Sequence, residues 1–368
     1  MTQLALSQLK LAHFRSHKSA LLDVDARPVA LFGPNGAGKT NILEAVSLIS
    51  PGRGLRNAAA SDMAKRPEDL GWKISSVLTS LGQTHEVETT SQANAARTVR
   101  IDSKPASQIM LGRIARVLWL VPSMDRLWIE GADGRRRFMD RMTLSFEPRH
   151  AEVALTYEKA MRQRNRLLKD GITDASWYRA LEDQMATAGA AITANRNMAL
   201  DHLVDAQKDV QTEFPNADLA LISANDHDSD QADDLAQALR DGRDADMRAG
   251  RTLTGPHRTD LDAVYRAKDV PAKLCSTGEQ KALLISLILA NARALKATLG
   301  MPPILLLDEV AAHLDANRRA ALYDEISALG AQAWMTGTET HLFDSLGDRA
   351  LYFEVTEADG TSMVTPHT

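Results

Sequence analysis

The sequence predicts an α/β fold in two halves that are separated by an inserted helical domain. Near the N-terminus, a glycine-rich loop at residues 33–40 follows a short apolar strand and precedes a helical pattern. Near the C-terminus, a second apolar strand at residues 304–307 ends in two acids, Asp308 and Glu309. Between them, residues 124–250 have fewer glycines and β-branched runs and are rich in Ala, Leu, Arg, Glu and Gln, which is typical of helices.

Size and composition describe an ordinary globular protein. The chain has 368 residues, 44% hydrophobic and 25% charged, enough for two or three domains with filled cores. One cysteine, Cys275, excludes a disulfide framework and suits a reducing compartment. The N-terminus does not resemble a signal peptide, and the longest apolar run, residues 282–290, is too short to span a bilayer. We therefore expect a cytoplasmic protein without a membrane partner.

The charge is distributed unevenly along the chain. The net charge of −5 argues against a uniformly basic nucleic-acid binder. However, the segment from Arg135 to Lys169 contains ten Lys and Arg residues but only four Asp and Glu residues. The segment from Asp226 to Asp246 contains eight Asp and two Arg residues. Such asymmetry predicts a basic face on an acidic protein.

The hydrophobic pattern predicts the elements of both halves and of the insert. The expected strands are residues 3–11, a run through Leu21 and Leu22, 29–32, an antiparallel meander of 72–79, 85–90 and 98–101, a buried strand at 116–121, then 261–266, 303–308, 334–336 and 351–355. The expected helices are residues 43–48, 134–144, 149–169, 176–214, 232–248, 276–299 and 317–329. No sustained heptads appear, so the insert is expected to be compact. The predicted domains are 1–123, 124–250 and 251–368.

The glycine-rich loop fits the phosphate-loop pattern G-x-x-x-x-G-K-[ST]. Its residues are Gly33, Pro34, Asn35, Gly36, Ala37, Gly38, Lys39 and Thr40, with Asn41 next to them. Glycines let consecutive N–H groups turn toward an anion, and the following helix points its positive end there. Lys39 would contact the β- and γ-phosphates of ATP, and Thr40 would ligate Mg²⁺. A glycine-rich hairpin or helix cap is the alternative, which the strand-loop-helix context disfavours.

The acidic strand end supplies the second half of this chemistry. Asp308 would hold Mg²⁺, and Glu309 would orient the water that attacks the γ-phosphate. Alone, a strand that ends in Asp-Glu could equally be a helix cap. Together with the phosphate loop, it predicts a nucleotide triphosphatase site.

A third segment combines a hydroxyl, a glycine and a helix start. Ser276, Gly278, Glu279 and Gln280 precede an apolar helix and could form an anion site, or a capping box with S-x-x-E spacing; the two readings are compatible. The segment resembles the Leu-Ser-Gly-Gly-Gln signature of ABC-type ATPases, and Asp315 follows the acidic pair as in that family. The resemblance implies that this site contacts ATP held by a second subunit, so that ATP drives formation of a homodimer.

Nearly the whole chain resembles the RecF family, short relatives of the SMC-type ATPases. The resemblance rests on Phe14-Arg15 and on residues 36–41, 134–140, 162–165 and 255–260. It implies an ABC-type ATPase head with an antiparallel β subdomain and an inserted compact all-helical domain. It also implies that Arg15 lies near the nucleotide, and that the protein binds DNA when ATP is bound. The implied role is recombinational repair at single-strand gaps, where RecO and RecR help to load RecA.

Two departures from ABC-type transporters suggest slow hydrolysis. Pro122-Ser123 stands where those ATPases place a Mg²⁺-sensing Gln, and Thr336-Gly337-Thr338 where they carry a switch His. A transporter subunit or another SMC-like ATPase is the alternative, which the long insert and Glu279 disfavour. An ATPase fused to a nuclease would need a further acidic domain after Asp315, for which the remaining sequence is too short.

Basic residues of the insert are candidates for DNA contact. They are Arg135, Arg136, Arg137, Arg141, Arg162, Arg164, Arg166 and Lys169. Helical spacing predicts that Arg162, Arg166 and Lys169 share one face, where they could neutralise phosphates without reading bases. A solvated helix surface with intrahelical acid–base pairs is the alternative for each residue. Few aromatic residues are interleaved, so base stacking is not expected.

Overall fold

The computed structural model describes residues 3–68, 70–92, 95–208, 210–223 and 231–367. The chain divides into two compact units. The head unit comprises Met1–Asp125, Asp209–Pro215 and Ser276–Thr368, and the insert unit comprises Arg126–Lys208 and Asn216–Cys275. The grouping differs from the predicted boundary at residue 250, because residues 251–275 pack with the insert through strand pairing.

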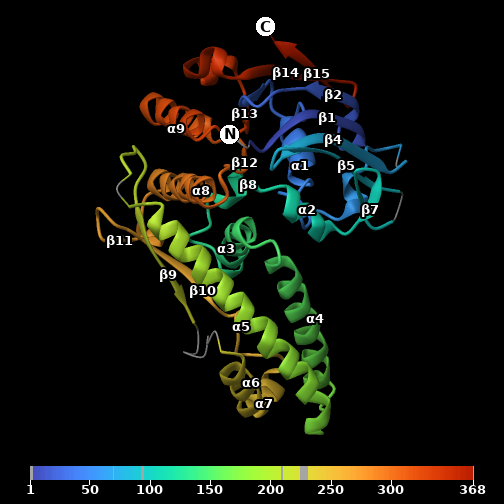
Figure 1. The fold of residues 1–368 in the computed structure, drawn as a ribbon, viewed down its shortest axis with the longest axis vertical. Coiled ribbons are helices and arrows are strands. Elements are labelled where there is room, and N and C mark those ends of the chain that lie inside the picture. Colours follow the sequence, from blue (N-terminus) through green and yellow to red (C-terminus); the bar gives the residue numbers. More distant parts are fainter. Residues whose placement is uncertain (1–2, 69, 93–94, 209, 224–230, 368) are drawn as a thin grey trace. The chain divides into compact units, whose positions relative to one another are not determined.

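A mainly parallel sheet forms the centre of the head unit (Figure 1). Its order is β15-β14-β3-β13-β12-β8. The strands are β3 (Val29–Phe32), β8 (Val117–Leu120), β12 (Ile304–Leu307), β13 (Ala333–Gly337), β14 (Leu351–Ala358) and β15 (Thr361–His367). Only the β14–β15 hairpin is antiparallel. Every residue of β3, β12 and β13 is buried, which explains the uninterrupted apolar sequences of β3 and β12 and the apolar start of β13.

A second, antiparallel sheet of the head unit has the order β2-β1-β4-β5-β6-β7. Its strands are β1 (Ala5–Phe14), β2 (His17–Asp23), β4 (Trp72–Ser80), β5 (Gln83–Ser91), β6 (Thr98–Ile101) and β7 (Lys104–Ala106). In β4 every second residue is buried, the pattern of a strand with one face on a core. The predicted meander is confirmed.

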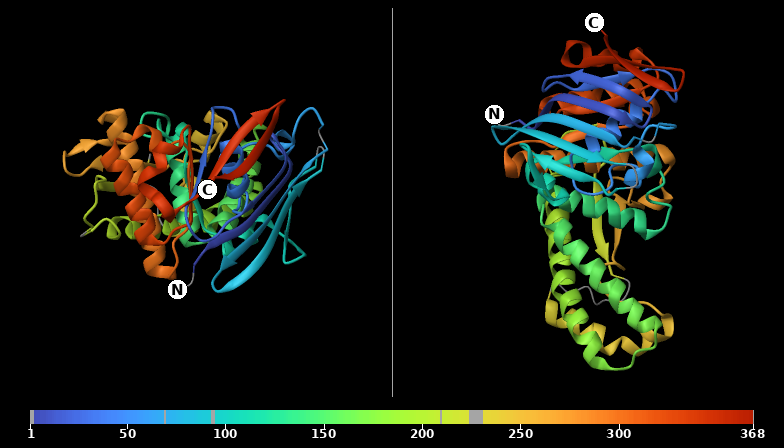
Figure 2. Two further views of the ribbon diagram at one scale, coloured as in Figure 1. Left: turned by 90° about the horizontal axis from the view of Figure 1, so that it is seen from above. Right: turned by 90° about the vertical axis from the view of Figure 1, so that its right-hand side faces the viewer.

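Helices join these sheets into one core. They are α1 (Lys39–Ser47), α2 (Gln108–Ile114), α8 (Thr277–Leu299) and α9 (Ala316–Leu329), with short 3₁₀ helices at Ala60–Met63, Pro122–Met124, Ala311–His313 and Thr340–Arg349. One hydrophobic cluster contains residues of α1 and of both sheets, and Figure 2 shows α1 beside the curved antiparallel sheet. Helix α8 is apolar enough to cross a membrane by length and composition, with a mean hydropathy of 1.5, but 72% of that window is buried in the protein. It is therefore a core helix of the head unit.

The insert unit is not all-helical, contrary to the prediction. Its helices are α3 (Ala132–Phe146), α4 (His150–Lys169), α5 (Ala175–Asp205), α6 (Ala232–Asp241) and α7 (Arg243–Ala249), followed by a 3₁₀ turn at Ala272–Leu274. A three-stranded sheet, β11 (Val270–Pro271), β10 (Asp260–Tyr265) and β9 (Ala217–Ile222), completes it. The helix predicted to reach residue 214 ends at Asp205, and β9 then pairs along its whole length with β10. Tyr157 of α4 and Met185 of α5 belong to the core between the helices.

Candidate nucleotide-binding site

The phosphate loop connects β3 to α1 and depends on its glycines. Gly36 and Gly38 have φ angles of 84° and 104°, a region that residues with a side chain rarely occupy. Gly33, with a φ of 144°, approaches β14 so closely that a Cβ would overlap the Val355 carbonyl. The loop is thus shaped by backbone requirements, and α1 begins directly at Lys39.

Lys39 lies at the centre of this loop. Its side chain is 4% exposed, and Nζ donates hydrogen bonds to the carbonyls of Gly33 at 2.7 Å and Pro34 at 2.9 Å. Burial lowers the pKa of the ammonium group, and the carboxylates of Glu309 and Asp308 partly offset that shift. A buried cation close to two acids is the arrangement needed to bind phosphate and metal together.

The acidic strand end lies against the start of α1. Thr40 Oγ1 donates to the carboxylate of Asp308, at 2.8 Å from Oδ1 and 3.1 Å from Oδ2. The neighbouring strand β13 supplies Thr336, whose Oγ1 donates to Asp308 Oδ1 at 2.8 Å and accepts the Glu309 N–H at 2.8 Å. The structure therefore brings together Lys39, Thr40, Asp308 and Glu309, as predicted.

The role of Thr336 was not predicted from the sequence. This position was considered only because it lacks a histidine, whereas its hydroxyl bonds both acidic residues. Glu309 has a φ of 53°, an uncommon conformation for a residue with a side chain, and its N–H is held by Thr336. The sequence feature that could have revealed this role is a polar residue, Thr336, near the end of an otherwise apolar strand.

The donor set suits Mg²⁺. A threonine hydroxyl and an aspartate carboxylate are hard oxygen ligands, and Mg²⁺ in phosphate-transfer sites takes one or two protein ligands with the phosphates and water. No group of three or more His, Cys, Asp or Glu residues with metal-binding geometry occurs in the described part of the chain. A metal would therefore be held jointly by Thr40, Asp308 and the nucleotide, and not by a protein cage.

Arg15 and Asn41 make side-chain contacts that support α1. Arg15 donates to both oxygens of Glu44, at 2.8 and 2.7 Å, and to the Asp62 carbonyl at 2.6 Å. Glu44 is fully buried one turn after Thr40. Asn41 donates to Ser16 Oγ at 2.7 Å. These contacts anchor the helix, and the nucleotide contacts predicted for Arg15 and Asn41 stay predictions.

The signature-like segment begins α8 as a capping box. The Ser276 hydroxyl accepts from the Glu279 N–H at 3.4 Å, and Glu279 Oε2 accepts from the Ser276 N–H at 2.8 Å. Ser276 and Gly278 are exposed, whereas Gln280 is 5% exposed and points into the protein. Among the residues that the structure describes, no hydrogen bond or ion pair joins Ser276 or Gly278 to Lys39, Thr40 or Asp308. Asp315 caps α9 by accepting from the Arg318 N–H at 2.9 Å.

Two of the predicted DNA contacts are structural residues of the insert unit. Arg164 is fully buried; it lies 2.5 Å from Asp246 Oδ2, 3.2 Å from Glu182 Oε1 and 2.9 Å from both Thr252 Oγ1 and the Leu239 carbonyl. Helical spacing cannot reveal that these partners come from other elements. The prediction that Arg164 contacts DNA is corrected.

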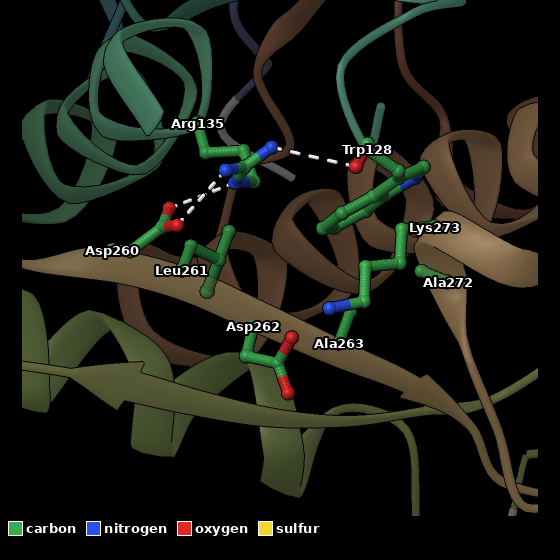
Figure 3. Close-up of a pocket in the computed structure, with 8 residues that line it drawn as sticks. All are labelled: Trp128, Arg135, Asp260, Leu261, Asp262, Ala263, Ala272 and Lys273. Carbon is green, nitrogen blue, oxygen red and sulfur yellow. Dashed lines mark hydrogen bonds and ion pairs between the residues drawn. The ribbon is translucent and has the colours of Figure 1, made fainter. Parts of the chain in front are cut away.

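Arg135 is committed to its own domain. It donates to both oxygens of Asp260, at 2.7 and 2.8 Å, and to carbonyls of Leu127 and Glu130 at 2.9 and 2.7 Å. Figure 3 shows the pair with Asp260 beside a small cavity of about 80 Å³. The prediction that Arg135 contacts DNA is therefore also corrected, because its guanidinium is already paired with Asp260.

The other candidates differ in exposure. Arg136 donates to the Thr259 carbonyl at 3.3 Å and pairs with Asp133. Arg141 is half-buried, and burial lowers the pKa of its guanidinium to about 9. The exposed candidates are Arg137, Arg162, Arg166 and Lys169.

Comparisons with known proteins agree with the fold. The chain matches the model of the RecF/RecN/SMC N terminal domain family over residues 5–359. It is 48% identical over 361 residues to a protein of Rhizobium rhizogenes described as DNA replication and repair protein RecF, covering 95% of this chain and 96% of the relative. A solved structure of the recombination mediator RecF with ATP, in the RecFOR pathway, has a TM-score of 0.83 at 23% identity, covering 99% of each chain. An SMC head from Pyrococcus furiosus has a TM-score of 0.57 at 15% identity, covering 99% of this chain and 96% of that one.

Fold and site together define an ABC-type ATPase head of the SMC class. Within that class, the chain belongs to the RecF family of DNA replication and repair proteins.

Proposed function

We propose that this protein binds DNA when ATP is bound, forms a homodimer around two ATP molecules, and acts in recombinational repair in the cytoplasm. The protein would act at single-strand gaps in DNA, where RecO and RecR would be its partners and RecA would be loaded. Membership of the RecF family supports this role, since a solved relative is described as a recombination mediator of the RecFOR pathway with ATP. The observation that carries the ATP-binding part is the hydrogen bond from Thr40 to Asp308, which joins residues 268 positions apart.

The head residues have distinct roles in this proposal. The phosphate-loop N–H groups and Lys39 bind the β- and γ-phosphates, and Thr40 and Asp308 hold Mg²⁺. When bound, Mg²⁺ neutralises phosphate charge. Glu309 orients the attacking water, and Thr336 positions Glu309 and Asp308. The absence of a switch histidine after β13 supports slow hydrolysis, with ATP acting mainly as a clamp.

The exposed start of α8 is the proposed contact to the second copy. Ser276 and Gly278 present a hydroxyl, a backbone N–H and the positive end of a 23-residue helix to solvent. We assign these groups to the γ-phosphate held by the partner. Each protomer would then complete the site of the other, which makes the dimer depend on ATP.

The exposed face of α4 is the proposed site for the DNA backbone. Lys159, Arg162, Arg166 and Lys169 are exposed and follow one another by three or four residues, so they share one side of the helix. The side chains of Arg162 and Arg166 are 76% and 86% exposed, and intrahelical pairs with acids leave them accessible. Such residues neutralise phosphates, and binding should weaken with salt by about 0.9 log units per tenfold salt for each contact.

Sedimentation with ATP and gapped duplex DNA tests the proposal. Wild-type protein is expected to form dimers and DNA complexes with ATP, and Lys39→Met to form neither, because the buried cation is lost from the phosphate loop. Lys18→Met, which changes an exposed lysine of β2, is the matched control and should behave as wild type. A wild-type protein that stays monomeric with ATP and DNA, or a Lys39→Met protein that behaves as wild type, would contradict the proposal.

A further inference from the structure

The turn formed by residues 255–260, between α7 and β10 of the insert unit, is held by side chains of three helices. Gly255 has a φ of 124°, and a Cβ there would overlap the hydroxyl of Tyr157. The same hydroxyl lies 2.8 Å from His257 Nδ1, while His257 Nε2 lies 3.1 Å from the Thr252 carbonyl. Since Nε2 must donate to a carbonyl, Nδ1 accepts from Tyr157. The first half of the turn is thus fixed by α4.

The second half of the turn is fixed by α3. The Thr259 carbonyl accepts from Arg136 at 3.3 Å, and Thr259 itself is buried. The next residue, Asp260, forms the two-bond pair with Arg135 that Figure 3 displays. Both arginines were candidates for DNA contact, and both are used to hold this segment.

Helix α5 holds the middle of the turn. Arg196 Nη1 donates to the Pro256 carbonyl at 2.7 Å, and the same guanidinium pairs with Asp140 at 2.7 Å. Arg196 is 5% exposed, so this contact is shielded from water. Five of the six residues are therefore tied to the domain by their side chains, their carbonyls or their lack of a Cβ.

Arg258 is the exception. Its N–H closes the turn by donating to the Gly255 carbonyl at 2.8 Å, but its side chain is exposed. That side chain makes no hydrogen bond or ion pair with any residue in the described part of the chain. The two arginines of α3 that hold this turn are already paired, Arg136 with Asp133 and Arg135 with Asp260. A backbone that neighbouring side chains hold in place, and that exposes one cation without an ion pair, is typical of a binding site.

We propose that Arg258 binds a phosphate oxyanion. A guanidinium presents a planar fork of donors that matches two phosphate oxygens, and it stays charged at any physiological pH. Because the turn is rigid, less backbone freedom is lost when the ligand binds. The phosphate comes either from a DNA backbone or from ATP held by a second copy of the chain. The inference rests on the proposed function, because DNA binding and the ATP-bound dimer supply these two sources of phosphate.

Arg258→Ala in the full-length protein tests this inference, with Arg251→Ala as matched control. Arg251 is also exposed and lies seven residues earlier in the same connecting segment. Two quantities are measured: affinity for duplex DNA with ATP over a range of salt, and the ATP concentration needed for dimers without DNA. The thermal midpoint should not change, because the Arg258 side chain has no partner to lose. Arg258→Lys should recover part of the loss, because it keeps the charge without the fork.

The two arms distinguish the sources. If DNA supplies the phosphate, Arg258→Ala should weaken binding about fivefold or more and make the slope of log K against log salt shallower by about 0.9. If ATP of the second copy supplies it, dimerisation should require at least about fivefold more ATP, with DNA affinity of the dimer unchanged. Failure of wild-type protein to bind DNA would remove the proposed function, and the dimer arm alone would then decide on Arg258. Wild-type behaviour of Arg258→Ala in both arms would overturn the inference alone.

Discussion

Among the basic residues of the insert unit, replacement of Arg164 is expected to lower the free energy of unfolding most. Replacement of Arg162, only two residues away, is expected to change it very little. Arg164→Met keeps a long apolar stem but removes the cation that bonds Asp246 and Glu182, both buried. Arg162→Met makes the same chemical change in a side chain that is 76% exposed and bonds Glu158. The two variants therefore separate burial from residue type.

The magnitude follows from what each variant leaves unpaired. Glu182 keeps a second partner, Arg243, but Asp246 loses its cation while 2% exposed. Removing one member of a buried ion pair costs about 3–5 kcal/mol, whereas an exposed pair one helical turn apart contributes about 0.3–0.5 kcal/mol. With a urea slope of about 2 kcal/mol per M, Arg164→Met should lower the midpoint by about 1.5–2.5 M and Arg162→Met by about 0.2 M.

Urea unfolding followed by far-UV circular dichroism measures these shifts. Because the chain has two units, the transition of the insert should be followed separately, for example by proteolysis of residues 126–275 at each urea concentration. Equal midpoints for Arg164→Met and Arg162→Met would refute the reasoning. In that case the buried network would not stabilise the unit, and Arg164 would again become a candidate for ligand contact.

Three further changes test other parts of the structure. Thr336→Val removes a bond to the Asp308 carboxylate worth about 1.5–3 kcal/mol, so ATP turnover should fall about 10- to 150-fold while ATP affinity, measured by titration, changes little. Gly255→Ala should lower the free energy of unfolding by more than Gly171→Ala, a glycine whose φ is also positive but which has no atom within 4 Å of an added Cβ; equal losses would contradict the tight packing of the turn. Burial lowers the pKa of His17 below its usual 6.5, so the unfolded chain takes up a proton first and stability falls as pH drops below about 6.5. His17→Gln should make the urea midpoint less dependent on pH between 5 and 7, and an unchanged dependence would exclude His17 as the cause.

The nucleotide site could be predicted because its chemistry is local in sequence. Residues 29–40 and 304–309 each carry a strand, its end and the reactive side chains in one short segment. Thr336 escaped prediction because its role depends on β13 lying beside β12, which no local pattern encodes. Arg164 and Arg135 were misread for the same reason. In the sequence, both look like members of a basic helix face. The fold pairs Arg164 with Asp246, 82 residues away, and Arg135 with Asp260, 125 residues away.

A strand was predicted at the place of β10, but its partner β9 was missed because β9 has a weak signal. Its sequence, Ala217–Ile222, contains two alanines and one aspartate, and it follows a long helical pattern that does not end at a glycine. Strand preference is largely a preference for packing on neighbours, and here the neighbour, β10, lies about forty residues later. The strand becomes recognisable only once β10 is in place.

The position of β3 in the parallel sheet has a consequence for synthesis of the chain on the ribosome. β3 leads into the phosphate loop, and its two sheet neighbours are β13 and β14, which pair Trp334 and Leu351 with Val29. A fully apolar strand made among the first 32 residues therefore waits for partners made some 300 residues later. Strands β1, β2 and β4 of the antiparallel sheet can associate early, but β3 stays without its sheet partners until β13 and β14 have been synthesised. The nascent chain has a prolonged need for protection from aggregation, and ATP binding becomes possible only after residues 304–309 and β13 have been synthesised.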